Sequence, residues 1–331
     1  MKKLLLCALV VGLLFTMPLT GKGRESCFKS TVDGIQNNPT FLIVGVDNAG
    51  ENTDFMMLSV YDSKLNSFNL LQIPRDTFCS GASSTGKING IYSAERARGR
   101  DPLEAMNTLS GFISDSLGVR IDGFVSYSLA SLERVVDSVG GVDINLKQPM
   151  DITDSSGKVV LSLKKGENHL SGKDAVTYIR HRKGYATQDL GRLDAQKIFL
   201  SAFLDAFKSE MGIELAARFI VDRGDGVVTN LRVSDFINLL VKNRGRISSM
   251  SMKLATMPGA AVTLDDVSYY SLSRASSMEI LNEFGFSVTG EFDSKRGFRK
   301  KDSPDFCRVY DSQDCKYVIY DNNTVKELIP K

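Results

Sequence analysis

Three apolar runs that follow one another between residues 41 and 74 most constrain the fold of this chain. They are FLIVGVD (41–47), MMLSVYD (56–62) and SFNLLQIP (67–74). Runs of this length with so few polar positions are typical of strands buried inside a sheet. We therefore expect the folded domain to begin near Pro39 with a buried sheet.

Helical and extended patterns alternate after these runs. Residues 102–118 and 128–141 predict helices, and the second of these ends in a glycine pair that is typical of a helix stop. Residues 123–128 and 141–147 predict strands, and 159–172 predict a strand that leads into a turn. With 331 residues, the chain is expected to form one large α/β domain in which strands and helices interleave.

The N-terminus has the pattern of an export signal. Lys2 and Lys3 precede an uncharged stretch from Leu4 to Gly21. Residues 1–21 are either a membrane anchor or a cleaved signal peptide, and we favour the anchor because no small-x-small cleavage site follows. Residues 22–38 then form a juxtamembrane linker, and residues 39–331 form an extracytoplasmic domain of a single-pass protein of the cell membrane.

Cysteines become possible disulfide partners outside the cytoplasm. Among Cys27, Cys79, Cys307 and Cys315, the last two are the easiest pair because a turn-like segment separates them. Unpaired thiols are the alternative.

Composition excludes several classes of function. Lys+Arg 41 against Asp+Glu 39 gives a net charge of +2, so no overall basic field indicates nucleic acid as a partner. His169 and His181 are the only histidines, which leaves little for a His-rich metal site. The chemistry therefore rests on carboxylates, guanidiniums and hydroxyls.

Acidic and basic residues follow the buried strands. Asp47 ends one strand and Asp54 begins the next, which suits either a Mg²⁺ site or ordinary turn chemistry. Arg75 and Asp76 follow the third strand, where the arginine can bind a phosphate or form a surface ion pair.

The segment 177–207 carries further charges. If its first part is extended, Arg180 and Arg182 project from one face. If a helix begins near Asp189, one stripe of it runs from charged and amide side chains to aromatic ones: Asp189, Arg192, Gln196, Phe199, Phe203 and Phe207. Such a stripe matches a ligand with a polar head and an apolar tail, although phenylalanines in a core are the alternative.

Eight ordered motifs between about residues 40 and 260 resemble those of the LytR-CpsA-Psr family: VGVD, TDFMMLSVYD, LLQIPRDTF, KINGIYS, LERVVDSVGGVDINL, GENHLSGKDAVTYIRHR, QDLGRLDAQK and ATMPG. The resemblance implies one α/β domain with a central mixed sheet flanked by helices and a hydrophobic lipid pocket. It also implies a Mg²⁺-dependent phosphotransferase that moves an anionic glycopolymer from an undecaprenyl-pyrophosphate carrier onto peptidoglycan.

The resemblance also implies roles for single residues. It makes Asp47 and Asp54 the metal ligands. Either Asp76 or Asp189 is the candidate general base on chemical grounds, and the sequence does not decide between them. The resemblance assigns the pyrophosphate to these residues: Arg75, Lys87, Arg180, Arg182, Arg192 and Gln196. The helical stripe described above makes Phe199, Phe203 and Phe207 the candidate residues for the lipid tail, while the role of Asn89 near Lys87 is open.

One departure from the family pattern keeps other functions open. The loop NAGENT is short, and Asn52 and Thr53 stand where the family carries an arginine before the second aspartate. A non-catalytic protein that binds polyprenyl lipid or wall polymer is one alternative. A ligase that attaches glycan to a surface protein is another, and the polymer itself, teichoic acid, capsular polysaccharide or another glycan, is not distinguished.

Overall fold

A computed structural model describes residues 38–47, 52–81, 83–187, 189–208, 226–231, 251–293 and 297–330. The expected anchor or signal peptide and the linker lie outside these residues. Within the described part, no helix combines the length and the apolar character needed to cross a bilayer.

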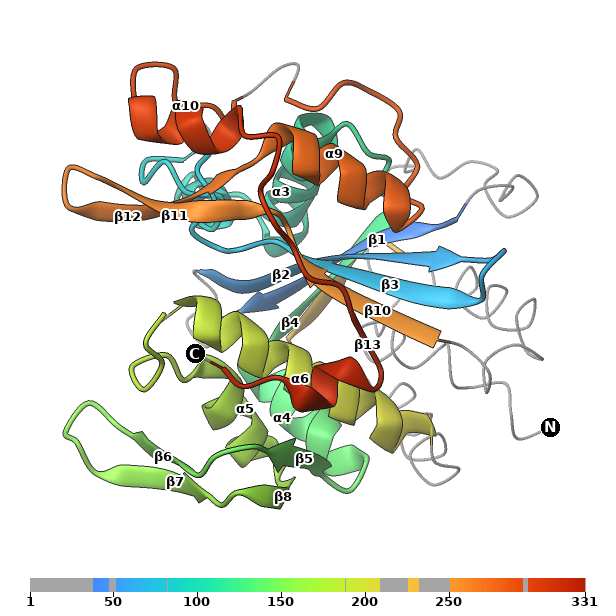
Figure 1. Cartoon of the computed structure of the whole chain (residues 1–331), viewed down its shortest axis with the longest axis vertical. Coiled ribbons are helices and arrows are strands. Elements are labelled where there is room, and N and C mark those ends of the chain that lie inside the picture. Colours follow the sequence, from blue (N-terminus) through green and yellow to red (C-terminus); the bar gives the residue numbers. More distant parts are fainter. Residues whose placement is uncertain are drawn as a thin grey trace.

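A central mixed sheet forms the middle of the described domain (Figure 1). Its strands lie in the order β13-β10-β3-β2-β1-β4-β9. The pairs β1/β2 and β2/β3 are antiparallel, whereas β1/β4 and β3/β10 are parallel. The bounds are β1 Thr40–Val46, β2 Thr53–Asp62, β3 Ser67–Gln72, β4 Gly123–Ser128, β9 Val227–Thr229, β10 Ser251–Thr256 and β13 Tyr320–Asp321.

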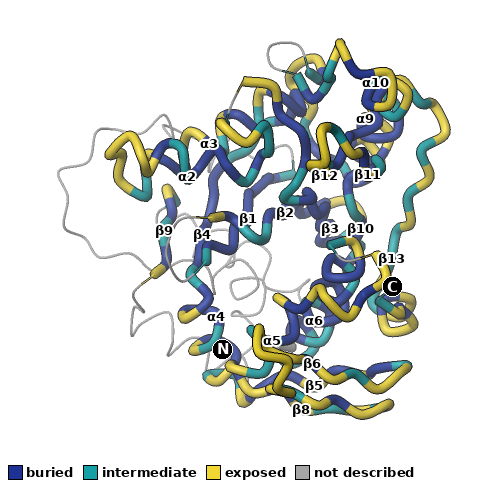
Figure 2. Tube along the Cα trace, turned by 90° about the vertical axis from the view of Figure 1, so that its left-hand side faces the viewer, coloured by how far each residue is buried: buried dark blue, intermediate teal, exposed yellow. Residues whose placement is uncertain are grey.

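The continuous apolar runs are explained by burial on both faces of this sheet. Phe41 and Ile43 of β1 belong to one hydrophobic core, and Leu42 and Val44 belong to another. Because successive side chains of a strand point to opposite faces, an uninterrupted apolar strand needs a covering layer on each side. Figure 2 shows these central strands buried along most of their length.

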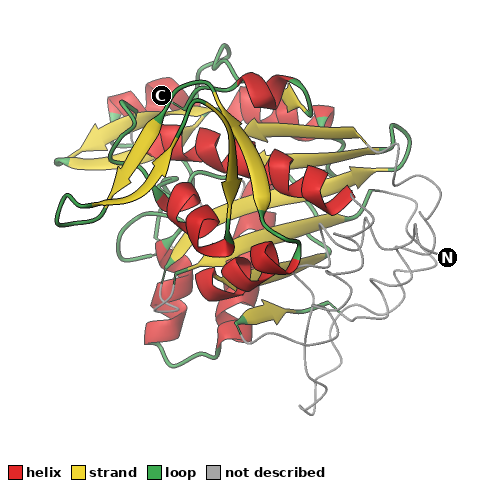
Figure 3. Ribbon diagram, turned by 90° about the horizontal axis from the view of Figure 1, so that it is seen from below, coloured by secondary structure: helices red, strands yellow, loops and turns green. Residues whose placement is uncertain are grey.

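Helices supply the two covering layers (Figures 1 and 3). On one side lie α2 Gly90–Ala97, α3 Pro102–Leu117, α9 Arg274–Glu283 and α10 Pro304–Tyr310. On the other lie α4 Leu129–Ser138, α5 Gly172–Arg180 and α6 Asp189–Lys208. The predicted α/β domain with helices flanking a mixed sheet is therefore confirmed.

Small two-stranded sheets border these layers. β5 Val142–Leu146 pairs with β8 Gly166–Leu170, and β6 Met150–Thr153 pairs with β7 Val159–Leu163. β11 Gly259–Leu264 and β12 Val267–Leu272 form a hairpin beside α10. The strands predicted at 141–147 and 159–172 are confirmed, the latter as two strands joined by a turn.

Local capping decides where the helices begin and end. Gly140 and Gly141, with φ of 84° and 89°, follow α4 and confirm the predicted stop. Ser171 and Asp174 form a capping box that begins α5, so the helix continues to Arg180.

The expectation of an extended segment through Arg180 and Arg182 is therefore wrong. Ala175, Tyr178 and Ile179 are buried at the spacing of a helix, and this pattern prevails over the alternation of the two arginines.

The C-terminal segment returns across the edge of the sheet (Figure 1). β13 pairs with β10, and the short helix η2 Thr324–Glu327 follows it. Val325 and Leu328 are buried in the same core as α6, and Lys326 Nζ lies 2.9 Å from Asp205 Oδ2 of that helix. The last described residues thus complete the core beneath the sheet.

The described cysteines are not paired. Cys79 is buried, and Cys307 and Cys315 are free thiols, so the pairing considered for the last two is wrong. Cys307 lies in α10, where its Sγ donates to the carbonyl oxygen of Lys300 at 3.4 Å. Cys27 lies outside the described residues.

The buried strands predict a large difference between two leucine substitutions. Leu42 in β1 is fully buried, whereas Leu65 in the β2–β3 turn is 64% exposed. We expect Leu42→Ala to lower the free energy of unfolding by about 2–5 kcal/mol because it leaves a cavity. Leu65→Ala should change it by less than about 0.5 kcal/mol. Urea unfolding followed by circular dichroism measures both values, and equal losses would contradict the burial of Leu42 in β1.

Candidate functional site

Arg75 is fixed at the end of β3 by backbone hydrogen bonds around it. Its carbonyl accepts from the amide of Asn89 at 3.2 Å, and the carbonyl of Asp76 accepts from the amide of Tyr270 at 2.9 Å. Pro74 restricts the backbone just before Arg75, and the carbonyl of Pro74 accepts from the amide of Thr77 at 3.0 Å. The arginine side chain therefore leaves the sheet from a rigid position.

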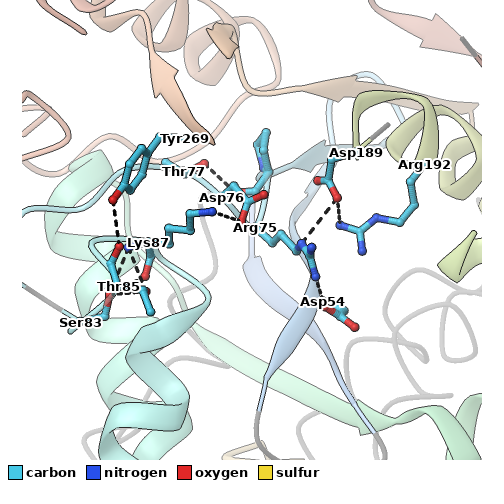
Figure 4. A network of polar contacts seen from close by, with 11 residues as sticks. Asp54, Arg75, Asp76, Thr77, Ser83, Thr85, Lys87, Asp189, Arg192 and Tyr269 are labelled. Atoms are coloured by element: carbon cyan, nitrogen blue, oxygen red, sulfur yellow. Dashed lines mark hydrogen bonds and ion pairs between the residues drawn. The ribbon is translucent and has the colours of Figure 1, made fainter. Parts of the chain in front are cut away.

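Two aspartates and two arginines alternate at this end of the sheet (Figure 4). Arg75 Nη1 lies 2.6 Å from Asp54 Oδ1, and its Nε lies 3.5 Å from Asp189 Oδ1. Asp189 Oδ1 also lies 2.7 Å from Nη2 of Arg192. These four residues, Asp54, Arg75, Asp189 and Arg192, are called the Arg–Asp cluster below.

Strand register and helix start bring the cluster together. β2 pairs with β3 at Met57 and Gln72, and continuing this antiparallel register by three residues sets Asp54 opposite Arg75. Asp189 is the first residue of α6, and Arg192 follows on the same face one turn later. The prediction that a helix begins at Asp189 is confirmed.

The charges of the cluster depend on one another. Burial alone would lower the pKa of Arg75, but Asp189 and Asp54 outweigh it and raise that pKa above its ordinary value. Burial lowers the pKa of Arg192, and Asp189 only partly counters this effect. Both guanidiniums nevertheless keep their charge, because an arginine loses its proton only far above physiological pH.

Arg192 carries an unused hydrogen-bond donor. The residue is only 2% exposed, and its Nε has no hydrogen-bond partner among the described residues, whereas its Nη2 forms the ion pair with Asp189 at 2.7 Å. Nε of Arg75 and Oδ1 of Asp189 are likewise without an aligned partner. Buried donors without acceptors are costly, so this arrangement favours an incoming anion.

Arg180 and Arg182, called the rim arginines below, are the other two arginines that the sequence assigns to the site. Both are exposed, and neither side chain forms a hydrogen bond or ion pair with a described residue. The charge of Arg182 reaches the cluster, since it helps to lower the pKa of Arg192. The four cluster charges cancel, so Arg182 adds an excess of positive charge beside them, while the place of Arg180 at the site stays a prediction.

Asp76 and Lys87 form a second ion pair beside the cluster. Lys87 Nζ lies 3.2 Å from Asp76 Oδ1 and 5.3 Å from the ring centroid of Tyr269 (Figure 4). Asp76 follows Arg75 directly, so the pair borders the site, but Lys87 contacts the carboxylate and not the cluster. Its predicted contact with a pyrophosphate stays a prediction.

The two aspartates predicted to bind metal lie at the end of β1 and the start of β2. Asp47 Oδ2 accepts from Asn52 Nδ2 at 2.9 Å, and Asp54 contacts Arg75. No group of three His, Cys, Asp or Glu side chains that could hold a metal occurs among the described residues. Two carboxylates fit Mg²⁺, which takes few protein ligands and keeps several waters, and do not fit a zinc site with four protein ligands. Mg²⁺ binding here stays a prediction.

An apolar cavity of about 60 Å³ lies between the sheet and helices α4, α5 and α6. Phe199, Leu200 and Phe203 of α6 line it, and the rings of Phe199 and Phe203 stack at 5.6 Å. Its other lining residues are Ile43, Phe55, Met57, Leu70, Tyr127, Ser131, Leu132, Val135, Ile179 and Gln196. The side chain of Phe207 lies outside the described residues.

The predicted stripe of α6 thus joins two environments. Its first turn carries Asp189 and Arg192 of the cluster, and Phe199 and Phe203 reach the cavity. Gln196 lies between them and is 4% exposed; its amide contacts Gln72, which sequence analysis did not select. The one signal for Gln72 was an amide side chain at the end of an otherwise apolar strand.

Comparison with known proteins identifies relatives over most of the chain. A model of the LytR_cpsA_psr family matches residues 20–284. The polyisoprenyl-teichoic acid–peptidoglycan teichoic acid transferase TagV of Bacillus subtilis strain 168 is 29% identical over 231 residues, 66% of this chain and 56% of TagV. TagU of the same organism, with the same transferase description, is 26% identical and covers 75% of this chain and 77% of its own.

A crystal structure of B. subtilis TagV has the same fold. It is similar with a TM-score of 0.59 and 24% identity, and the match covers 75% of this chain and 96% of that structure. This chain therefore spans little more than half the length of full TagV but nearly all of its crystallised part.

The buried charge and unused Nε of Arg192 predict an anion site that can be tested without an enzyme assay. Inorganic pyrophosphate should raise the thermal unfolding midpoint of the wild-type protein, by an amount that corresponds to about 2.7 kcal/mol at one hundred times Kd. Arg192→Gln should abolish most of this rise because it removes the buried charge. The control is Arg308→Gln on α10, whose side chain is 80% exposed. An equal rise in both variants would show that pyrophosphate binds elsewhere.

Proposed function

The chain belongs to the LytR_cpsA_psr family, and on this premise we propose that it transfers an anionic glycopolymer from an undecaprenyl-pyrophosphate carrier onto peptidoglycan. The observation that carries the proposal is the direct succession of the Arg–Asp cluster and the apolar cavity along α6. A ligand that suits both has a strongly anionic head and an apolar tail. The transferase names of TagV and TagU support the same proposal.

In this proposal the pyrophosphate of the carrier binds between the cluster and the rim. Arg192 offers its unused Nε, and Arg75 offers a guanidinium fixed between two carboxylates. Arg180 and Arg182 supply the excess charge that a pyrophosphate requires. Planar guanidiniums suit this task because they bind phosphate oxygens with two parallel donors and stay charged.

The proposed reaction is a phosphoryl transfer. A hydroxyl of the peptidoglycan glycan attacks the phosphorus bound to the polymer, and the bond from that phosphorus to the bridging oxygen breaks. Undecaprenyl phosphate leaves with this electron pair, while the new phosphodiester joins polymer and wall. The arginines stabilise the charge that builds on the phosphates, which is the main catalytic effect in such transfers.

Asp76 is the carboxylate that we assign as general base. Asp189 bridges two arginines and so has a role in orienting them, whereas the described partner of Asp76 is Lys87 alone. Asp76 would accept the proton of the attacking hydroxyl. Mg²⁺ held by Asp47 and Asp54 would neutralise phosphate charge when bound.

The tail of the carrier is proposed to enter the cavity beside Phe199 and Phe203. Phenylalanine, leucine and methionine side chains form most of its wall, which suits an apolar tail that leaves water. We also propose that residues 1–21 anchor the chain in the cell membrane, which would hold the domain outside the cytoplasm beside both the carrier and the wall.

The first test is transfer of labelled glycan from a polyprenyl-pyrophosphate donor to peptidoglycan oligomers by the full-length protein in detergent. We expect transfer with Mg²⁺ and none with EDTA. Asp47→Ala, Asp54→Ala and Asp76→Asn should each lower kcat by about 10²-fold or more. Asp305→Ala on α10, with a side chain 66% exposed, is the matched control.

Other outcomes would select other functions. Tight binding of the donor without turnover would indicate a lipid-binding protein, and transfer to a surface protein but not to peptidoglycan would indicate a ligase. Turnover that persists in EDTA would refute the role of the metal, and an unchanged kcat in Asp76→Asn would refute that of the base.

The cavity predicts that head and tail binding can be separated. Val135 of α4 lines the cavity and is 3% exposed, so Val135→Phe fills the space that the tail would occupy. Loss of burial of two methylene groups alone, at about 0.8 kcal/mol each, weakens binding roughly tenfold. Calorimetry should show this loss for a long-chain polyprenyl phosphate and none for inorganic pyrophosphate. Unchanged affinity for the lipid would exclude this cavity as its site.

A further inference from the structure

A buried chain of amide hydrogen bonds lies directly beneath the Arg–Asp cluster. Nε2 of Gln72 donates to Oε1 of Gln196 at 2.7 Å, and Nε2 of Gln196 donates to the carbonyl oxygen of Ile179 at 3.2 Å. Gln72 is 1% exposed and Gln196 is 4% exposed. This amide chain therefore connects β3, α6 and α5 inside the protein.

Each member of the amide chain lies close in sequence to an arginine of the site. Gln72 precedes Arg75 by three residues, and Gln196 follows Arg192 by four, which is about one helical turn. Ile179 immediately precedes Arg180 and is followed by Arg182 three positions on. The hydrogen bonds of Gln196 thus connect the three segments that carry these arginines, namely the end of β3, α6 and the end of α5.

Directional bonds are needed here because the surrounding contacts are not directional. Below Gln196, α6 packs on the sheet through Phe199, Leu200 and Phe203, which line an apolar cavity. Apolar contacts of this kind tolerate small shifts of a helix along its axis. Two buried amides, in contrast, satisfy each other in only one alignment, and a shift would leave them unpaired in an apolar environment.

We propose that Gln72 is a positioning residue for the anion site. Through Gln196 it sets where α6 and the end of α5 lie relative to β3, so that Arg75, Arg192 and the rim arginines converge on one pyrophosphate. Gln72 itself touches no substrate; it acts through Gln196, whose side chain is held by hydrogen bonds and separates the cluster from the cavity. The inference deepens the proposed function and rests on it for the identity of the anion.

The test compares two variants of similar cost to stability. Gln72→Leu removes the link and leaves Gln196 unpaired on one side. Leu281→Ala, at a residue of α9 that is 1% exposed in the opposite core, destabilises the protein away from the site. Urea unfolding measures the stability of both, and calorimetry on the folded full-length proteins measures Kd for inorganic pyrophosphate.

We expect Gln72→Leu to weaken pyrophosphate binding by about tenfold, and Leu281→Ala to change it by less than twofold at an equal or larger loss of stability. Gln72→Met, which keeps the length of the side chain but not its amide, should behave like Gln72→Leu and is the second variant if the first does not fold. In the transfer assay, both Gln72→Leu and Gln72→Met should raise KM for the donor.

Wild-type affinity for pyrophosphate in Gln72→Leu or Gln72→Met would overturn the inference. So would a loss of affinity in Leu281→Ala as large as that in Gln72→Leu, because the effect would then follow stability alone. Failure of the proposed function is distinguishable: a wild-type protein that binds pyrophosphate but transfers nothing refutes the function and leaves the role of Gln72 to be decided by the binding data.

Discussion

Repulsion between guanidiniums is the constraint on which the site depends. Arg75 and Arg192 can lie near each other only because Asp54 and Asp189 alternate with them at 2.6–3.5 Å. Each aspartate comes from a different element, one from β2 and one from the first turn of α6. The antiparallel register of β2 and β3 and the starting point of α6 are therefore requirements of the charge pattern as much as of the fold.

At the same end of the sheet, the charged Arg–Asp cluster borders the apolar cavity. Arg192 and Gln196 lie one turn apart on α6, yet the first faces ionised groups and the second borders a cavity walled mostly by apolar side chains. Such a boundary is what an amphipathic lipid requires, because its head must keep polar partners while its tail leaves water. The proposed transferase would bind its donor across this boundary.

Sequence patterns predicted the strands β1 to β5 and β7, the helices α3 and α4, and the start of α6, because hydrophobic periodicity and the spacing of Asp189, Arg192 and the phenylalanines are local signals. They failed for Arg180, where a capping box and three buried residues outweigh the alternation of two arginines. They also missed Gln72, whose partner Gln196 lies 124 positions away. A hydrogen bond between such distant residues exists only once the fold has formed.

The return of the C-terminal segment to the sheet has a consequence for the order of folding. Val325 and Leu328 fill the core that α6 shares with β1, so that core closes only when the chain through Leu328 is available. A chain that emerges vectorially, from a ribosome or a translocation channel, would expose α6 as an unfinished apolar face until then. Chaperone contacts during biosynthesis should therefore concentrate on this late-closing layer.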